Sequence, residues 1–218
     1  MTALPVLPTW SNFRVLLLPG WLNSPPAHWQ SRWETLYGFE RVLQSDWEWP
    51  RRGDWMARLD EVLLTTPDPA PVPASHPAFA RAKPVLLVAH SLGCQLVAAW
   101  AEHSAHTARV RGALLVAVPD TARADTPHQL STWRRVPGNV LPFTTRLLFS
   151  SNDPFCTPPR AQAMAATWGA RARGLGALGH INGDSGLGDW PAGLQALARL
   201  ATHMAADVAA DAAAGRLS

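Results

Sequence analysis

The chain has few cysteines and no long apolar run. Its two cysteines, Cys94 and Cys156, are too few for a disulfide framework. No apolar stretch approaches the roughly 20 residues that a membrane-spanning helix needs. The segment from Met1 to Arg14 lacks the basic and apolar regions of a signal peptide. These absences predict a cytoplasmic, reduced protein without a membrane span.

A contiguous basic surface is also missing from the sequence. The net charge is +3, but Lys83 is the only lysine, and the arginines are scattered apart from small clusters at 51–52 and 134–135. Nucleic-acid binding needs a basic stripe or patch, so we expect no nucleic-acid partner. The apolar content of 47% and the length of 218 residues are those of an ordinary one-domain globular protein.

Short apolar runs alternate with amphipathic segments along the chain, a pattern typical of parallel βα units. Strands are expected at residues 13–18, 40–43, 85–89, 112–118, 146–150 and 173–178. Helices are expected at residues 28–37, 54–64, 92–102, 161–169 and from Asp189-Trp190-Pro191 onward. The sequence therefore predicts an α/β fold with a mostly parallel central sheet and helices on both faces.

Residues 65–84 are rich in proline, which predicts an extended surface connection. We do not expect a domain boundary there, because the next strand completes the same sheet. The alanine-rich tail, 205–218, is expected to fray. The prediction is one domain over 1–218 with its core at about 13–204.

Ser91 stands between an apolar strand and a helix-forming segment, in Val88-Ala89-His90-Ser91-Leu92-Gly93. A serine at such a corner has a strained backbone and an outward hydroxyl, as in the G-x-S-x-G nucleophile elbow. The positions two before and two after must be small, and here they are Ala89 and Gly93. Ser91 is the predicted nucleophile.

A serine nucleophile needs a histidine base and a carboxylate that orients the histidine. In this type of sheet the acid and then the histidine follow the serine in the chain, just beyond strand ends. Asp153 is the preferred acid and Asp120 its rival; either could instead be a turn aspartate that caps backbone amides. His180, between glycines and after the last expected strand, is the preferred base.

The other histidines are given no catalytic role. His90 adjoins Ser91, but its side chain should diverge and pack or hydrogen-bond locally. His103 and His106 share a helical face without a third ligand of matching spacing, so no metal site is expected. The remaining histidines are interpreted as ordinary surface or loop residues: His28, His76, His128 and His203.

An oxyanion hole needs two backbone N–H groups. One is expected from Leu92 and the other from Trp21, in the loop after the first strand, where Asn23 and Ser24 could brace the turn. The long segment 119–142 could form a small cap. The candidates for a substrate pocket are Trp21, Asn23, His90 and Trp133.

The motifs Leu18-Pro19-Gly20-Trp21, Ala89-His90-Ser91-Leu92-Gly93, Ser151-Asn152-Asp153-Pro154 and Gly179-His180-Ile181-Asn182 resemble one family. It is the family of small α/β-hydrolases related to retinoblastoma-binding protein nine and its bacterial YdeN-type relatives. The resemblance runs from about residue 13 to residue 200. It implies a compact α/β-hydrolase with a minimal lid, and a triad of Ser91, Asp153 and His180.

The leading functional hypothesis is a serine hydrolase that cleaves small carboxylic esters through an acyl-enzyme, without metal or organic cofactor. An amidase, peptidase or acyltransferase with the same triad is an alternative. A binding protein that keeps the fold without catalysis is another. The expected partner is a small ester or amide, and the sequence gives no oligomeric state.

Overall fold

The computed structural model describes residues 10–65 and 83–214, with side chains described as far as Thr202. In this part of the chain, strands form one sheet in the order β2-β1-β3-β4-β5-β6, and all neighbouring pairs are parallel. The strands are β1 (Arg14–Leu18), β2 (Glu40–Arg41), β3 (Val85–His90), β4 (Val110–Val116), β5 (Thr144–Phe149) and β6 (Arg171–Gly174).

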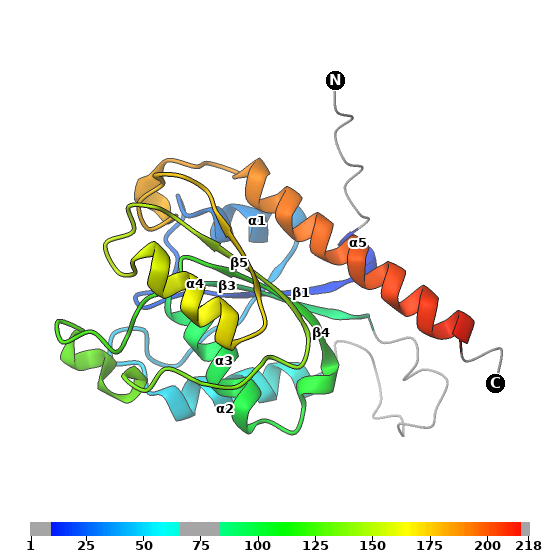
Figure 1. Ribbon diagram of the computed structural model, residues 1–218, viewed down its shortest axis with the longest axis horizontal. Coiled ribbons are helices and arrows are strands. Elements are labelled where there is room, and N and C mark those ends of the chain that lie inside the picture. Colours follow the sequence, from blue (N-terminus) through cyan, green and yellow to red (C-terminus); the bar gives the residue numbers. More distant parts are fainter. Residues whose placement is uncertain (1–9, 66–82, 215–218) are drawn as a thin grey trace.

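Helices cover both faces of the sheet (Figure 1). The helices are α1 (Trp29–Tyr37), α2 (Arg52–Leu64), α3 (Leu92–His103), α4 (Pro158–Thr167) and α5 (Pro191–Ala214). Helices α2, α3 and α4 pack on one face, and α1 and α5 pack on the other. Side chains of a strand point alternately to the two faces, so Leu16 joins the first core and Leu17 the second. The central strand β3 is buried along its whole length, as strands covered on both faces are.

The predicted α/β fold with a parallel central sheet and helices on both faces is confirmed, and most boundaries shift by a few residues. The weak strand at 40–43 is only two residues long. The alanine-rich tail expected to fray continues α5 to Ala214. The proline-rich connection predicted at 65–84 lies largely outside the described residues. No helix in the described part of the chain is long and apolar enough to cross a membrane.

The order of the strands decides where the site forms. The chain passes from β1 outward to β2, and then crosses to the other side of β1 to form β3, β4, β5 and β6. In open α/β sheets such a reversal leaves a crevice at the carboxyl ends of the two strands that flank it. Here the loops that follow β1 and β3 meet at that edge. The segment after β4 contains the short helix η4 (His128–Trp133).

Candidate active site

Ser91 occupies the sharp corner between β3 and α3. Its backbone is left-handed, with φ 52° and ψ −123°, and its N–H donates to Val116 O at 2.9 Å. Gly93 lies against the end of β1, where an added Cβ would stand 2.3 Å from Leu18 O. The glycine two positions after Ser91 therefore lets α3 approach β1 closely. Strain of this kind persists only where the surrounding structure holds it.

Ser91, His180 and Asp153 form a continuous chain of polar contacts. His180 Nε2 lies 2.9 Å from Ser91 Oγ, and His180 Nδ1 lies 3.0 Å from both carboxylate oxygens of Asp153. The His180 and Asp153 side chains are 10% and 3% exposed. A carboxylate only accepts, so the contact favours a proton on Nδ1 and leaves Nε2 free to accept from the Ser91 hydroxyl.

Asp120, the rival acid, lies in a different environment. Its carboxylate pairs with Arg160 at 3.2 Å and accepts from Ala122 N at 3.3 Å. It therefore caps a turn and makes a surface ion pair. The structure brings Asp153 to the histidine in its place.

The loops that carry the acid and the histidine are tied together by neutral groups. We define the acid loop as residues 150–154 and the histidine loop as residues 175–182. Ser150 Oγ accepts from Leu178 N at 2.9 Å, and Asn152 Oδ1 accepts from Gly179 N at 2.8 Å. Ser150 and Asn152 carry no sequence signal for this role, since a Ser-Ser-Asn-Asp stretch is also ordinary turn chemistry.

Two buried imidazoles stand beside the histidine loop. His90 Nε2 lies 2.9 Å from the carbonyl oxygen of His180, and because a carbonyl only accepts, this nitrogen carries the proton. The His28 and His90 rings lie 4.6 Å apart between centroids. Burial, with the charges of His28 and His180, lowers the pKa of His90 well below its ordinary value. His90 is therefore a neutral hydrogen-bond donor. This agrees with the expectation that its side chain packs or hydrogen-bonds locally.

His28, interpreted from the sequence as an ordinary surface or loop residue, lies buried in the turn before α1. It is 2% exposed and caps α1, with Nδ1 accepting from Gln30 N at 3.1 Å. Burial, reinforced by the positive charge of Arg41, lowers the pKa of His28 to about 3. A histidine at an N-cap is uncommon compared with Ser, Thr, Asp or Asn, so the local sequence carried no signal for this role.

Helix α1 also supplies two supports that the sequence analysis missed. Gln30 Nε2 donates to Val88 O at 3.1 Å and to Leu18 O at 3.3 Å, joining the carboxyl ends of β3 and β1. Trp29 Nε1 donates to Ile181 O at 2.8 Å, next to the site histidine. The side chains that begin α1 thus reach both the sheet edge and the histidine loop.

The loop that follows β1, residues 19–24, lies directly against Ser91. We call it the oxyanion loop. An added Cβ on Gly20 would stand 2.7 Å from Ser91 Cβ, so only glycine fits. Among the described residues, neither Trp21 N–H nor Leu92 N–H has a hydrogen-bond acceptor. For Leu92 this is expected, because the first N–H groups of a helix have no intrahelical partner.

The expected pocket residues are not all at the site. Trp133 is 1% exposed, its ring contacts Trp55 at 5.4 Å between centroids, and its indole N–H donates to Pro50 O. It is therefore a core residue and offers almost no surface to a substrate. Asn23 Oδ1 accepts from Ser24 N at 2.7 Å, and Trp21 Nε1 donates to Glu48 O, so both side chains brace loops.

Exposed apolar side chains flank the site instead. Phe155 is 51% exposed, with its ring centroid 4.6 Å from that of His180. Leu22, in the oxyanion loop, is 58% exposed. Neither residue is predictable from the sequence, because an apolar residue in a loop has no distinctive pattern. Phe155 therefore places apolar surface beside the site histidine.

The cysteines lie outside this polar chain. Cys94 is buried with Sγ 3.3 Å from Val116 O, and burial raises its pKa. Burial also raises the pKa of Cys156 to about 12. Both thiols therefore stay protonated at neutral pH. In residues 10–65 and 83–202, no cluster of three or more His, Cys, Asp or Glu side chains is arranged to hold a metal ion.

The fold and the elbow define the class of protein. A parallel sheet covered on both faces, with a left-handed serine between β3 and α3 and loops from β1, β5 and β6 around it, is the architecture of an α/β-hydrolase.

The chain belongs to the serine hydrolase family: the family model described as "Serine hydrolase" matches residues 15–199. A YdeN-like hydrolase from Pectobacterium atrosepticum is 25% identical, with 90% of this chain and 94% of that one covered and a TM-score of 0.73. The ydeN gene product of Bacillus subtilis is 17% identical, with coverage of 87% and 99% and a TM-score of 0.61.

A thermophilic esterase from Thermogutta terrifontis shares the fold, at 13% identity, coverage of 88% and 90% and a TM-score of 0.58. No match is found among curated proteins. The family match and the structural neighbours confirm the resemblance to YdeN-type hydrolases that the motifs indicated.

Proposed function

We propose that the protein hydrolyses small carboxylic esters, with Ser91, His180 and Asp153 as its catalytic triad. The observation that carries this proposal is the series of contacts from hydroxyl to imidazole to carboxylate, at 2.9 and 3.0 Å. Distances of about 2.6–3.2 Å are those over which a base can take a nucleophile's proton. Membership of the serine hydrolase family supports the same chemistry.

The reaction follows from the groups in place. His180 Nε2 takes the hydroxyl proton as Ser91 Oγ attacks the acyl carbon, and the carbonyl oxygen becomes an oxyanion. The N–H groups of Trp21 and Leu92, which have no acceptor among the described residues, stabilise that charge. His180 then protonates the departing alkoxide, and the acyl group stays on Ser91.

In deacylation, water takes the place of Ser91 as the nucleophile and Ser91 Oγ becomes the leaving group. His180 takes a proton from water, the resulting hydroxide attacks the acyl carbon, and Ser91 Oγ leaves with the proton returned by the imidazolium. Asp153 stays ionised and holds the imidazole in the tautomer that both steps need. The burial of Asp153 keeps water from competing for the contact.

The side chains at the site favour a substrate with an apolar portion. Phe155 is more than half exposed with its ring centroid 4.6 Å from that of His180, and Leu22 of the oxyanion loop is also more than half exposed. Apolar surface of this kind gains free energy when a ligand covers it, at about 25 cal/mol per Å². We therefore expect a short acyl chain to be preferred over a charged acyl group.

The test is the hydrolysis of p-nitrophenyl butyrate by Ser91→Ala, beside the matched variant Ser151→Ala in the acid loop. Ser91→Ala should lose at least about 10⁴-fold in kcat with an unchanged melting temperature, because the nucleophile is gone. Ser151→Ala should retain wild-type turnover. Full activity of Ser91→Ala would refute the proposed function. The matched p-nitroanilide, run in parallel, separates esterase from amidase activity, and we expect the ester to react faster.

A further inference from the structure

The oxyanion loop has a backbone conformation that needs outside support. Leu22 and Asn23 are both left-handed, with φ values of 65° and 66°, although neither is glycine. Residues in this region persist only where their surroundings over-determine them, and such positions cluster at functional sites. Asn tolerates the conformation better than Leu, whose side chain has no local hydrogen bond to offer. A contact outside the loop must therefore hold it.

Arg41 holds the Asn23–Ser24 end of the loop, while at the other end the Leu22 N–H donates to Trp47 O at 3.1 Å. Arg41 lies on β2, paired in register with Leu17 of β1, the strand that leads into the loop. Its Nη1 donates to Asn23 Oδ1 at 2.8 Å and to Ser24 O at 2.9 Å. Because Asn23 Oδ1 also accepts from Ser24 N, one guanidinium nitrogen anchors both residues of the turn.

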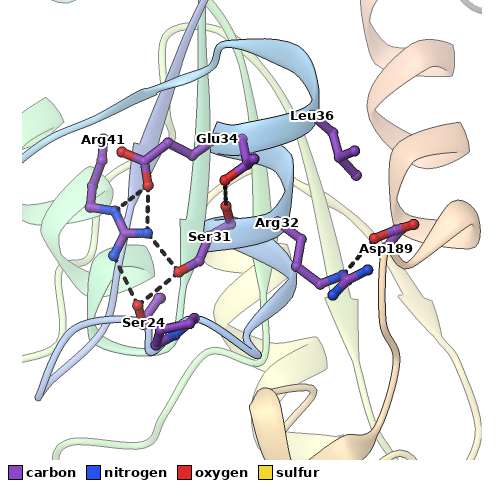
Figure 2. Close-up of a pocket in the computed structure, with 9 residues that line it drawn as sticks. Ser24, Ser31, Arg32, Glu34, Leu36, Arg41 and Asp189 are labelled. Atoms are coloured by element: carbon purple, nitrogen blue, oxygen red, sulfur yellow. Dashed lines mark hydrogen bonds and ion pairs between the residues drawn. The ribbon is translucent and has the colours of Figure 1, made fainter.

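The guanidinium is itself fixed by α1. Glu34 Oε2 accepts from Arg41 Nε at 2.9 Å and from Nη2 at 2.6 Å, and Ser31 Oγ lies 2.6 Å from Nη2. Figure 2 shows Arg41 between Glu34 and Ser24, with Ser31 beside it. The Arg41 side chain is 10% exposed. Only a planar, five-donor group can make all these contacts at once, and a lysine ammonium cannot.

The position of the oxyanion loop determines where its backbone N–H groups lie relative to Ser91. The first half of the loop packs so closely on the nucleophile that a Cβ at Gly20 would overlap Ser91 Cβ. Between Gly20 and the anchored pair stands Trp21, whose N–H is the second proposed oxyanion donor. A shift of about 1 Å at such a donor costs on the order of 100-fold in rate.

We propose that Arg41 is the positioning residue of the oxyanion loop. It holds Asn23 and Ser24, and through them it aims the Trp21 N–H at the developing oxyanion. Its hydrogen bonds go to the loop and to α1, not to the reacting groups, so it acts through the loop. This inference rests on the proposed function, because it assigns a role within the same site.

The experiment compares Arg41→Lys with Arg14→Lys. Arg14 is a matched control because it is also a largely buried arginine paired with a glutamate, but it joins β1 to Glu40 of β2 through two 2.9 Å hydrogen bonds at 14% exposure, away from the loop. Each variant is titrated with a fluorophosphonate to count active sites. The measurements are kcat and KM for p-nitrophenyl butyrate, and the inhibition constants of butylboronic acid and of butyrate.

Arg41→Lys should lower kcat about 10- to 100-fold with KM nearly unchanged, since the lost contact serves the transition state. The inhibition constant of the boronic acid, whose adduct places an oxygen in the oxyanion hole, should rise in parallel, while that of butyrate stays constant. Arg14→Lys should leave all of these values at the wild-type level. Equal kinetics for the two arginine variants would overturn the inference.

Two variants of Asn23 test the role of Arg41 if Arg41→Lys does not fold. Asn23→Gly keeps the left-handed backbone but removes the acceptor, and it should show the same loss in kcat. Asn23→Asp keeps the acceptor oxygen, and it should restore kcat towards wild type. Equal activity of the Gly and Asp variants would overturn the inference. Ser91→Ala in the same assay tests the proposed function separately, because its retained activity would refute the triad whatever Arg41 does.

Discussion

The two sides of the site are held by different kinds of contact. On the oxyanion side, a backbone with two left-handed residues is held by a charged group, Arg41, together with bonds to Trp47 O and Glu48 O. On the base side, the acid and histidine loops are held by neutral groups, namely the buried side chains of His90, Trp29 and Ser150 and the exposed side chain of Asn152. A backbone N–H can be aimed only by fixing its loop, whereas an imidazole needs a fixed tautomer in dry surroundings. We therefore expect substitutions on the two sides of the site to change kcat and stability by different amounts.

The largest effect should come from Asp153→Asn on the base side. The amide can present an N–H to His180 Nδ1 and so favours the wrong tautomer, which costs about 10⁴-fold in kcat in a comparable triad. Asp120→Asn is the matched control and should leave kcat unchanged, since Asp120 pairs with Arg160. Steady-state kinetics on the two variants give the result. A loss in Asp120→Asn equal to that in Asp153→Asn would contradict the assignment.

Gly93→Ala should disturb the close contact between α3 and the end of β1, which lies between the two sides of the site. The added methyl would stand 2.3 Å from Leu18 O, so α3 must move away from β1. Overpacking of this kind destabilises by about 1–3 kcal/mol, and here it should also lower kcat. Gly53→Ala in α2, where the methyl meets no atom within 4 Å, should instead stabilise by about 0.5–1 kcal/mol. Chemical denaturation measures both, and equal stability of the two variants would refute the close approach.

His28 should make stability depend on pH. Its pKa is about 3 in the folded protein, against an ordinary value of 6.5, so below pH 6.5 the unfolded chain binds a proton that the folded chain does not. Stability is therefore complete above pH 6.5 and falls as the pH drops towards 3, by about 1.4 kcal/mol per pH unit. His28→Asn keeps a capping acceptor and should make the profile between pH 7 and pH 4.5 shallower by this amount, while the contribution of His90, whose pKa is also lowered, remains. The exposed His128→Asn should keep the wild-type profile; identical profiles for all three proteins would contradict the prediction.

The smallest effect should come from Trp29→Phe, which removes one N–H from the histidine loop. A single lost hydrogen bond costs about 1 kcal/mol of stability, and the freed Ile181 carbonyl should also let His180 shift and lower kcat. Trp168→Phe removes the same kind of bond, to Pro137 O at 3.0 Å, on the α4 side of the sheet. It should lose similar stability at unchanged kcat. If the two variants had equal kcat, the Trp29 hydrogen bond would not position the histidine loop and would support only the core, as the Trp168 bond does.

The sequence was sufficient for the fold and for the residues with distinctive chemistry. Apolar runs and the Ser91 elbow carry strong local patterns, and an aspartate and a histidine in the loops that follow β5 and β6 are readable because parallel strands end at one edge. His28 and Trp133 were misplaced because burial depends on which face of the sheet a residue meets, and no local pattern reports that. Arg41 escaped notice because its partners, 7 to 18 residues away, meet it only after β2 pairs with β1.

The most direct test of the account is the reaction of the protein with a fluorophosphonate, followed by peptide mass spectrometry. Only an activated serine reacts readily with this probe. We expect one equivalent of label, on Ser91, at a rate that falls by orders of magnitude in His180→Gln. Label on another residue, or labelling of Ser91 at the same rate in wild type and His180→Gln, would contradict it.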